Sequence, residues 1–191
     1  MKMRKVLLVA LAIAMISASS VFGQSYKPFK VGLGLLYAVP SGEGAGGGIG
    51  FYFEPKYNVN DKFDVGFLIE KALLVQLATD FTKETVSALA SYSITGDYML
   101  GTGKVRPFIG TGIGMYNLGS MDGITVDQNN NVVPGKITLG TKFGFSPRVG
   151  INLSHFQIEL QYHLIMGQDA DLISKNYLGI KMGIEFGGGL K

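Results

Sequence analysis

The stretch Phe156–Ile165, with the sequence FQIELQYHLI, alternates strictly between apolar and polar residues. One parity carries Phe156, Ile158, Leu160, Tyr162 and Leu164, and the other carries Gln157, Glu159, Gln161 and His163. Successive side chains of a β-strand point to opposite faces, so this stretch predicts a strand with one apolar and one polar face.

The same pattern recurs from about Phe29 to Phe186 and is broken by turn-rich segments. We expect eight strands, at residues 29–39, 48–58, 63–72, 86–98, 105–116, 137–151, 156–166 and 176–187. Their connections alternate between short ones, at 58–62, 100–104 and 152–155, and long ones, at 40–47, 73–85, 117–136 and 167–175. This layout predicts an all-β, eight-stranded, antiparallel up-and-down transmembrane β-barrel, with the short turns and both termini in the periplasm.

The first residues have the order of a secretory signal peptide. Lys2, Arg4 and Lys5 precede an apolar run at 6–16 and a small-residue region at 17–20. We place cleavage after Gly23, with Ala18 and Ser20 as alternatives. The chain then divides into a signal peptide at 1–23 and one barrel domain at 24–191.

Composition excludes several classes of function. The chain has 17 Lys and Arg against 14 Asp and Glu, and three of the basic residues lie in the leader, so the mature chain has 17 − 3 = 14 against 14. No basic patch indicates a nucleic-acid partner. The count of Cys is 0, which excludes disulfides and thiolate metal sites.

Charge within the expected strands falls on one parity. These residues are Lys30, Glu54, Lys56, Asp64, Glu70, Asp97, Arg106, Lys142, Arg148, Glu159, Lys181 and Glu185. Lys71 is the one strand charge on the apolar parity, and it lies near a strand end. A lipid-facing Lys or Arg costs roughly 2–4 kcal/mol at the bilayer midplane, so exclusion of charge is expected of an outward face.

Two kinds of secreted barrel share this alternation. A lipocalin-like barrel turns its apolar face inward around a ligand, and a membrane barrel turns it outward. Glycine favours the membrane barrel, because many strand glycines share the charged parity: Gly32, Gly34, Gly66, Gly110, Gly112, Gly114, Gly140, Gly144, Gly150, Gly179 and Gly183. On a solvated face they would weaken the sheet, whereas inside a narrow barrel they make room for long side chains.

Aromatic residues mark the short-turn ends of the strands. Phe29, Tyr57, Phe63, Tyr98, Phe156 and Phe186 all belong to the apolar parity there. Aromatic rings are enriched at the membrane–water interface, so we interpret them as a periplasmic girdle. Ordinary cross-strand packing is the alternative.

Three segments resemble the OmpX, OmpA-barrel and OmpW type of small outer-membrane barrel, especially the short barrels of Bacteroidota. They are residues 105–114 (VRPFIGTGIG), 143–150 (FGFSPRVG) and 181–186 (KMGIEF). The last is similar to the signal read by the barrel-assembly machinery. The resemblance implies a bacterial outer-membrane location, contact with lipid and lipopolysaccharide, and loops open to an extracellular partner.

The twelve charges on the polar parity comprise six basic and six acidic residues, which can pair inside the barrel. We therefore expect a polar plug, with a gated narrow path as the alternative. The first functional hypothesis is a structural or surface-interaction barrel. The second, implied by the OmpW resemblance, is a narrow transporter for small hydrophobic compounds, and the third is a barrel enzyme that modifies lipid A or cuts peptides.

The third hypothesis lacks a recognisable catalytic set. Only His155 and His163 are present, and neither has an identifiable nucleophile and orienting group in the sequence. Residues 127–131 (DQNNN) lack the glycine and the closing Glu of a calcium loop, and the glycine-rich 42–48 lacks the context of a phosphate loop. We predict no catalytic, metal or cofactor residue. Leu73, Val75 and Leu77 continue apolar past the expected membrane edge, as a strand extension, a short helix or a contact site for a partner or hydrophobic solute.

Overall fold

The computed structural model describes residues 26–41, 47–76, 85–118, 120–126, 132–138, 140–167 and 176–188. The expected signal peptide, Leu77 and the segment 127–131 lie outside these residues. The strands are β1 (Phe29–Pro40), β2 (Gly48–Asn58), β3 (Phe63–Gln76), β4 (Thr85–Met99), β5 (Val105–Asn117), β6 (Ser120–Val126), β7 (Val132–Thr138), β8 (Thr141–Leu153), β9 (Phe156–Ile165) and β10 (Tyr177–Gly187). Among the described residues, no helix is long and apolar enough to cross a membrane.

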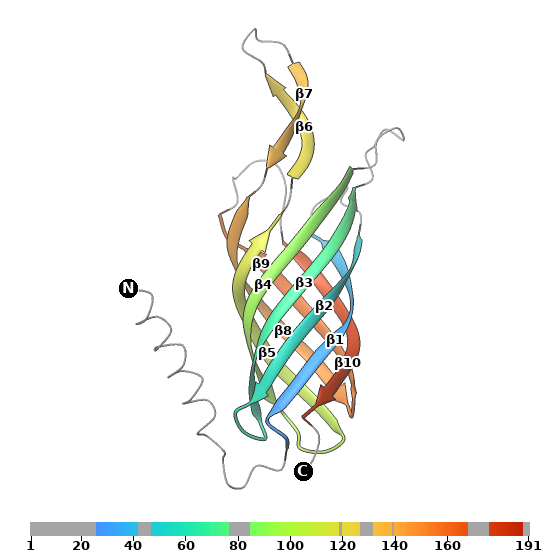
Figure 1. Ribbon diagram of the computed structural model, residues 1–191, viewed down its shortest axis with the longest axis vertical. Coiled ribbons are helices and arrows are strands. Elements are labelled where there is room, and N and C mark those ends of the chain that lie inside the picture. Colours follow the sequence, from blue (N-terminus) through green and yellow to red (C-terminus); the bar gives the residue numbers. More distant parts are fainter. Residues whose placement is uncertain are drawn as a thin grey trace, which may run out of the picture.

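Eight strands close into an antiparallel barrel in the order β1-β10-β9-β8-β5-β4-β3-β2 (Figure 1). Each barrel strand therefore pairs with the barrel strand before and after it in the chain, and β1 closes the barrel against β10. The predicted fold class is confirmed. The short connections, between β2 and β3, β4 and β5, and β8 and β9, lie at one end, which we call the short-turn end, together with the start of β1 and the end of β10 (Figure 1). The opposite end is the long-loop end.

The connection between β5 and β8 contains a second sheet that the sequence did not predict. β6 and β7 pair in register from Ser120↔Thr138 to Val126↔Val132, and this hairpin projects beyond the long-loop end (Figure 1). The prediction of one strand at 137–151 was wrong at its start, because Ile137 belongs to β7 and β8 begins at Thr141. Gly140 separates the two with φ +69°, a left-handed conformation that glycine adopts without strain, so it is not a lumen-facing strand residue.

The apolar parity faces out and the charged parity faces in. Phe51 and Leu160 are 54% and 45% exposed, whereas Arg148 and Glu159 are 4% and 1% exposed. This arrangement confirms the barrel expected from the glycines and contradicts the lipocalin-like alternative. Large apolar side chains are exposed on all eight barrel strands, as in a wall that meets lipid.

Glycines create the space that the lumen side chains occupy. A methyl group on Gly150 would lie 2.5 Å from Cζ of Phe108, and one on Gly144 would lie 2.6 Å from Cε2 of Tyr116. At Gly110 it would collide with the carboxylate of Asp97. In a lumen this narrow, an aromatic or charged side chain fits only where a nearby strand position is a glycine, which has no Cβ.

The expected aromatic girdle lies on the outer surface at the short-turn end. Phe29, Phe63, Tyr98, Phe156 and Phe186 are exposed, and Tyr57 is half-buried. Phe29 and Tyr57 face each other across β1 and β2 with ring centroids 5.1 Å apart in an edge-to-face arrangement. The rings therefore form an outward band that also contains the cross-strand packing considered as its alternative.

Candidate functional site in the barrel lumen

A continuous chain of ion pairs runs along the lumen. From the short-turn end, Lys30 contacts Asp64 (2.6 Å) and Glu185 (3.4 Å). Glu185 also lies 3.5 Å from Lys56, which contacts Glu54 and Asp97 at 3.1 Å each. These six side chains come from five strands, because β2 supplies both Glu54 and Lys56, so the chain of contacts links opposite walls of the barrel.

Arg148 is the centre of this chain. Its Nε and Nη2 donate to the two carboxylate oxygens of Asp97 at 2.6 Å each, and its Nη1 donates to Glu54 at 2.7 Å. The same Nη1 lies 3.6 Å from Glu159. A two-pronged contact between guanidinium and carboxylate is among the strongest and most directional hydrogen-bonded pairs in proteins. Arg148 therefore ties β8 to β2, β4 and β9.

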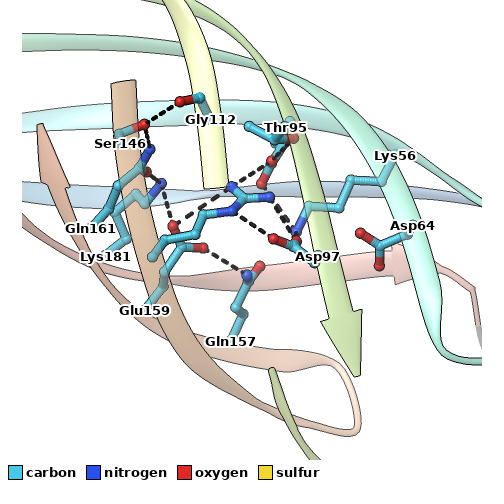
Figure 2. Close-up of polar contacts among 12 residues, drawn as sticks. Lys56, Asp64, Thr95, Asp97, Gly112, Ser146, Gln157, Glu159, Gln161 and Lys181 are labelled. Atoms are coloured by element: carbon cyan, nitrogen blue, oxygen red, sulfur yellow. Dashed lines mark hydrogen bonds and ion pairs between the residues drawn. The ribbon is translucent and has the colours of Figure 1, made fainter. Parts of the chain in front are cut away.

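Lys181 continues the chain from Glu159 to Glu70 (Lys181 and Glu159 are labelled in Figure 2). It contacts Glu159 at 2.7 Å and Glu70 at 3.2 Å, and it donates to the side-chain oxygen of Gln161. Glu159 contacts both Arg148 and Lys181, so the chain of ion pairs is continuous between these two residues.

Ten of the twelve predicted lumen charges are thus connected by ion pairs among the described residues, four basic and six acidic. Neutral donors serve four of the acidic side chains. Thr95 donates to Glu54 (2.7 Å), Ser91 to Glu70 (2.6 Å), Gln157 to Glu159 (3.0 Å) and Asn152 to Glu185 (3.1 Å). Buried charge is costly unless it is paired and hydrogen-bonded. The hydrogen bonds from these hydroxyl and amide groups therefore stabilise a network in which six carboxylates share four cations.

The other two predicted residues lie at the two ends of the lumen. Arg106, buried at the short-turn end, donates to the carbonyl oxygens of Gly101 (3.4 Å) and Asp61 (2.7 Å) and lies 4.1 Å from the ring centroid of Tyr26. Lys142 is half-buried at the long-loop end, opposite Tyr116 on β5.

An apolar and aromatic layer lies in the lumen at the long-loop end. It consists of Leu36, Ala38, Ala72, Leu89, Tyr116, Leu118, Ile165 and Tyr177, all buried. The sequence prediction described only a polar plug and missed this layer. The sequence contained the information needed to find this layer, because these residues lie at positions of the same parity as the inward charged residues of their strands.

His163 lies where the ionic chain meets the apolar layer. Its ring stacks on Tyr177 with centroids 4.0 Å apart, its Nδ1 lies 3.0 Å from the Tyr116 hydroxyl, and its Nε2 lies 3.7 Å from Oε2 of Glu70. The sequence did not identify a serine near His163, and the structure places Ser91 on the same carboxylate oxygen of Glu70. Ser91 and His163 are each 0% exposed, so this cluster has no surface for a substrate.

The sequence prediction placed Gln157 and Gln161 on the polar parity of β9 but did not include the neutral side chains in the lumen network. Ser91, Thr95, Ser146, Gln157 and Gln161 are at most 2% exposed, and Ser146 accepts a hydrogen bond from Gln161 at 2.6 Å (Figure 2). They share the parity of the charged residues, so extending that parity to every polar residue would have found them. No cluster of three or more His, Asp or Glu side chains able to hold a metal ion occurs within the described ranges.

The external segment considered as a contact site continues a strand. β3 runs through Leu73 to Gln76 and pairs with β4 as far as Gln76↔Thr85, so the helical alternative was wrong for this part. Leu73 is 57% exposed, and the backbone of Val75 belongs to β3. β3 and β4, with 14 and 15 residues, are the longest strands and reach beyond the others at the long-loop end (Figure 1).

Comparisons with known proteins find the fold in solved structures only. No family model matches the chain, and no curated protein matches it. Neisserial surface protein A is similar with a TM-score of 0.60 and 16% identity, over 86% of this chain and 99% of that one. The outer membrane protein OprG of Pseudomonas aeruginosa is similar with a TM-score of 0.55 and 12% identity, over 87% and 99%. The chain has the fold of the small eight-stranded outer-membrane barrels.

Proposed function

We propose that the protein is a bacterial outer-membrane barrel whose body is a sealed anchor and whose long loops meet the cell's surroundings. The observation that carries the proposal is the double closure of the lumen. Ten charged side chains are interlocked through its middle, and eight apolar or aromatic residues fill it at the long-loop end. An eight-stranded barrel has an interior just wide enough to be filled by its own side chains.

The outer surface supports the membrane location. Large apolar residues are exposed along every barrel strand, and aromatic rings gather at the short-turn end. Acyl chains would cover this surface, with lipopolysaccharide and phospholipid as the partners of the barrel wall. In the orientation typical of such barrels, the short-turn end is periplasmic and the long-loop end is outside the cell.

The β6–β7 hairpin supports a role in surface interaction. It forms its own two-stranded sheet beyond the long-loop end, so its backbone lies away from the barrel wall (Figure 1). Leu73 and its neighbours on β3 provide a second raised edge at the same end. A protein partner bound outside the cell would meet these two elements first.

Single-channel recording on the refolded protein in planar lipid bilayers tests the proposal. The wild-type barrel is expected to insert and to stay electrically silent. A triple variant, Leu36→Ala, Tyr116→Ala and Tyr177→Ala, removes the bulk of the apolar layer and leaves the ion-pair chain in place, so it is expected to stay silent as well. Reproducible conductance steps from the wild-type protein would contradict the sealed anchor.

The second candidate is a narrow transporter for small hydrophobic compounds. The apolar layer favours it, because a hydrophobic solute entering from the long-loop end would meet Leu36, Leu89 and Ile165 before the chain of ion pairs. Uptake of a hydrophobic dye into liposomes separates the two functions, since only a transporter accelerates it. Leu73→Ser combined with Val75→Ser and Leu77→Ser tests whether the raised edge takes part: unchanged cell-surface binding and unchanged uptake would remove this edge from both proposals.

A further inference from the structure

Lys71 is the one charged residue on the outer face of the described barrel strands, and its side chain is exposed. Its neighbours on the same face of β3 are Ile69 and Leu73, and it pairs with Phe51 on β2 and with Ala90 on β4. The sequence placed Lys71 near a strand end, whereas β3 continues for 76 − 71 = 5 residues beyond it. The charge therefore lies within the apolar wall and has an apolar neighbour on each of its four sides.

The barrel wall itself supplies no counter-charge on this face. The acidic residues of the described barrel strands are all buried in the lumen: Glu54, Asp64, Glu70, Asp97, Glu159 and Glu185. They lie on the opposite face of the sheet from Lys71. A lysine ammonium on a lipid-facing wall is costly near the bilayer midplane and costs little near the interface. The depth of Lys71 and the charge of the lipid beside it therefore decide how the wall tolerates this residue.

The position of Lys71 along β3 gives its depth. Phe63 begins β3 in the aromatic band at the short-turn end, and Lys71 follows it by 71 − 63 = 8 residues. At about 3.3 Å per residue and a strand tilt of roughly 40°, the Cα atom of Lys71 lies about 20 Å farther toward the long-loop end. The apolar band of such barrels is about 25 Å tall, so about 5 Å separate this atom from the far edge of the band. The four-carbon stem of lysine brings the ammonium group to the level of the lipid headgroups.

Tyr37 marks the same level on another strand. It lies on β1, 37 − 29 = 8 residues beyond Phe29 of the aromatic band, and it is exposed on the outer face. Tyrosine is enriched where the hydrocarbon of a membrane meets the headgroups. β1 and β3 are separated only by β2 in the barrel, so an interfacial tyrosine and Lys71 lie on the same side of the wall.

We infer that Lys71 binds a phosphate group of lipid A, the membrane-embedded part of lipopolysaccharide, in the outer leaflet. The inference rests on the proposed outer-membrane location with the long-loop end outside the cell, and it names the lipid group that the wall binds. Lipid A carries phosphate monoesters, whose charge of about −1.5 to −2 attracts an ammonium more strongly than the single charge of a phospholipid diester. The small side chain of Ala90 on β4 leaves the ammonium open to the headgroup.

Solid-state NMR tests the contact directly, through dipolar recoupling between lysine ¹⁵Nζ and lipid ³¹P in phosphatidylcholine bilayers that contain lipid A. Monoester and diester phosphorus give separate ³¹P signals, so the two kinds of lipid are distinguished. We expect a lysine signal that contacts monoester phosphorus and is lost in Lys71→Met. Lys142→Met is the matched control, because Lys142 lies at the same end of the barrel but on the lumen side, and the signal should survive it. A contact only to diester phosphorus, or no contact that is lost in Lys71→Met, would overturn the inference.

Urea unfolding in the same bilayers tests whether the contact stabilises the barrel. Adding lipid A is expected to lower the unfolding equilibrium constant of the wild-type protein and of Lys142→Met roughly fivefold more than that of Lys71→Met. Phosphatidylglycerol at the same phosphate content is expected to have a smaller effect on the wild-type protein. Equal stabilisation by the two lipids, or an equal response of Lys71→Met and the wild-type protein to lipid A, would overturn the inference. Either result leaves the sealed anchor untouched, since that proposal depends on the conductance recordings.

Discussion

Arg148 contacts three carboxylates in the buried interior of the barrel, so its replacement tests the lumen at the level of one side chain. Arg148→Met leaves Asp97 and Glu54 without their closest cation. Removing one partner of a buried ion pair costs about 3–5 kcal/mol, so we expect the free energy of unfolding to fall by that amount. Urea titration read by the shift in gel mobility between folded and unfolded barrel measures it.

Lys142→Met is the control for this substitution. Lys142 is half-buried at the long-loop end, and its loss is expected to change stability by less than about 1 kcal/mol. If Arg148→Met were as well tolerated as Lys142→Met, the ion pairs would not hold the strands together.

Gly150 tests how tightly the lumen is filled. In Gly150→Ala the new methyl would lie 2.5 Å from the ring of Phe108 and 2.6 Å from the carbonyl oxygen of Ile158, which is part of the β9 backbone. Overpacking of this kind costs about 1–3 kcal/mol. Gly32→Ala is the matched control, because its methyl would have no neighbour closer than 3.6 Å. Equal unfolding free energies for the two variants in urea would show that the lumen has spare room.

At the scale of one strand, the cost of charge should depend on depth in the membrane. Leu160 lies midway along β9 and is 45% exposed, whereas Val105 begins β5 at the short-turn end and is 55% exposed. Leu160→Arg is expected to lower the unfolding free energy in lipid bilayers by about 2–4 kcal/mol, and Val105→Arg by at most about 1 kcal/mol. Equal losses of unfolding free energy in the two variants would mean that Leu160 does not lie deeper in the membrane than Val105.

The β6–β7 hairpin should be separable from the barrel. β6 and β7 form a sheet of their own, and this sheet projects from the long-loop end of the barrel. Replacing residues 120–138 by a short Gly–Ser linker is expected to change the unfolding free energy by less than about 1 kcal/mol, because insertions and deletions at such sites leave a core intact. A variant that no longer gives the folded band on a gel would contradict this independence.

Strand parity accounts for what the sequence could predict at this scale. In β9, parity alone places Gln157, Glu159 and Gln161 inside and Leu160 outside, and the structure confirms each placement. Parity does not report strand length outside the membrane, so the sequence predicts a loop at 117–136 where the structure has most of the β6–β7 hairpin, and a strand from 137 where β8 begins at Thr141. An apolar residue that is assigned to the outer face by its type alone can be placed on the wrong face. Leu36 and Tyr177 were missed for this reason, although their positions in the strands are inward.

For the whole molecule, the pairing partners could not be read from the sequence. Equal numbers of opposite charges predict that they pair, but not which residues pair. Arg148 on β8 contacts Asp97 on β4 and Glu54 on β2, and neither strand is next to β8 in the sheet. Such contacts depend on the diameter of the barrel and on the stagger of its strands, which set how side chains meet across the lumen. The same geometry brings the β4–β5 turn, the β8–β9 turn, Tyr26 and Gly188 together around a cavity at the short-turn end.

The account depends on the apolar wall meeting lipid while a filled lumen stays apart from it. Contacts between protein methyl groups and lipid acyl chains, measured as intermolecular NOEs in nanodiscs, test this on the unaltered protein. Methyls of Ile94, Ile109 and Leu160, which are 69%, 52% and 45% exposed, should show NOEs to the acyl chains. Methyls of Leu36, Leu68 and Leu89, buried inside the barrel, should show none. Acyl-chain NOEs to Leu36 and Leu68, with none to Ile94 and Leu160, would contradict the account.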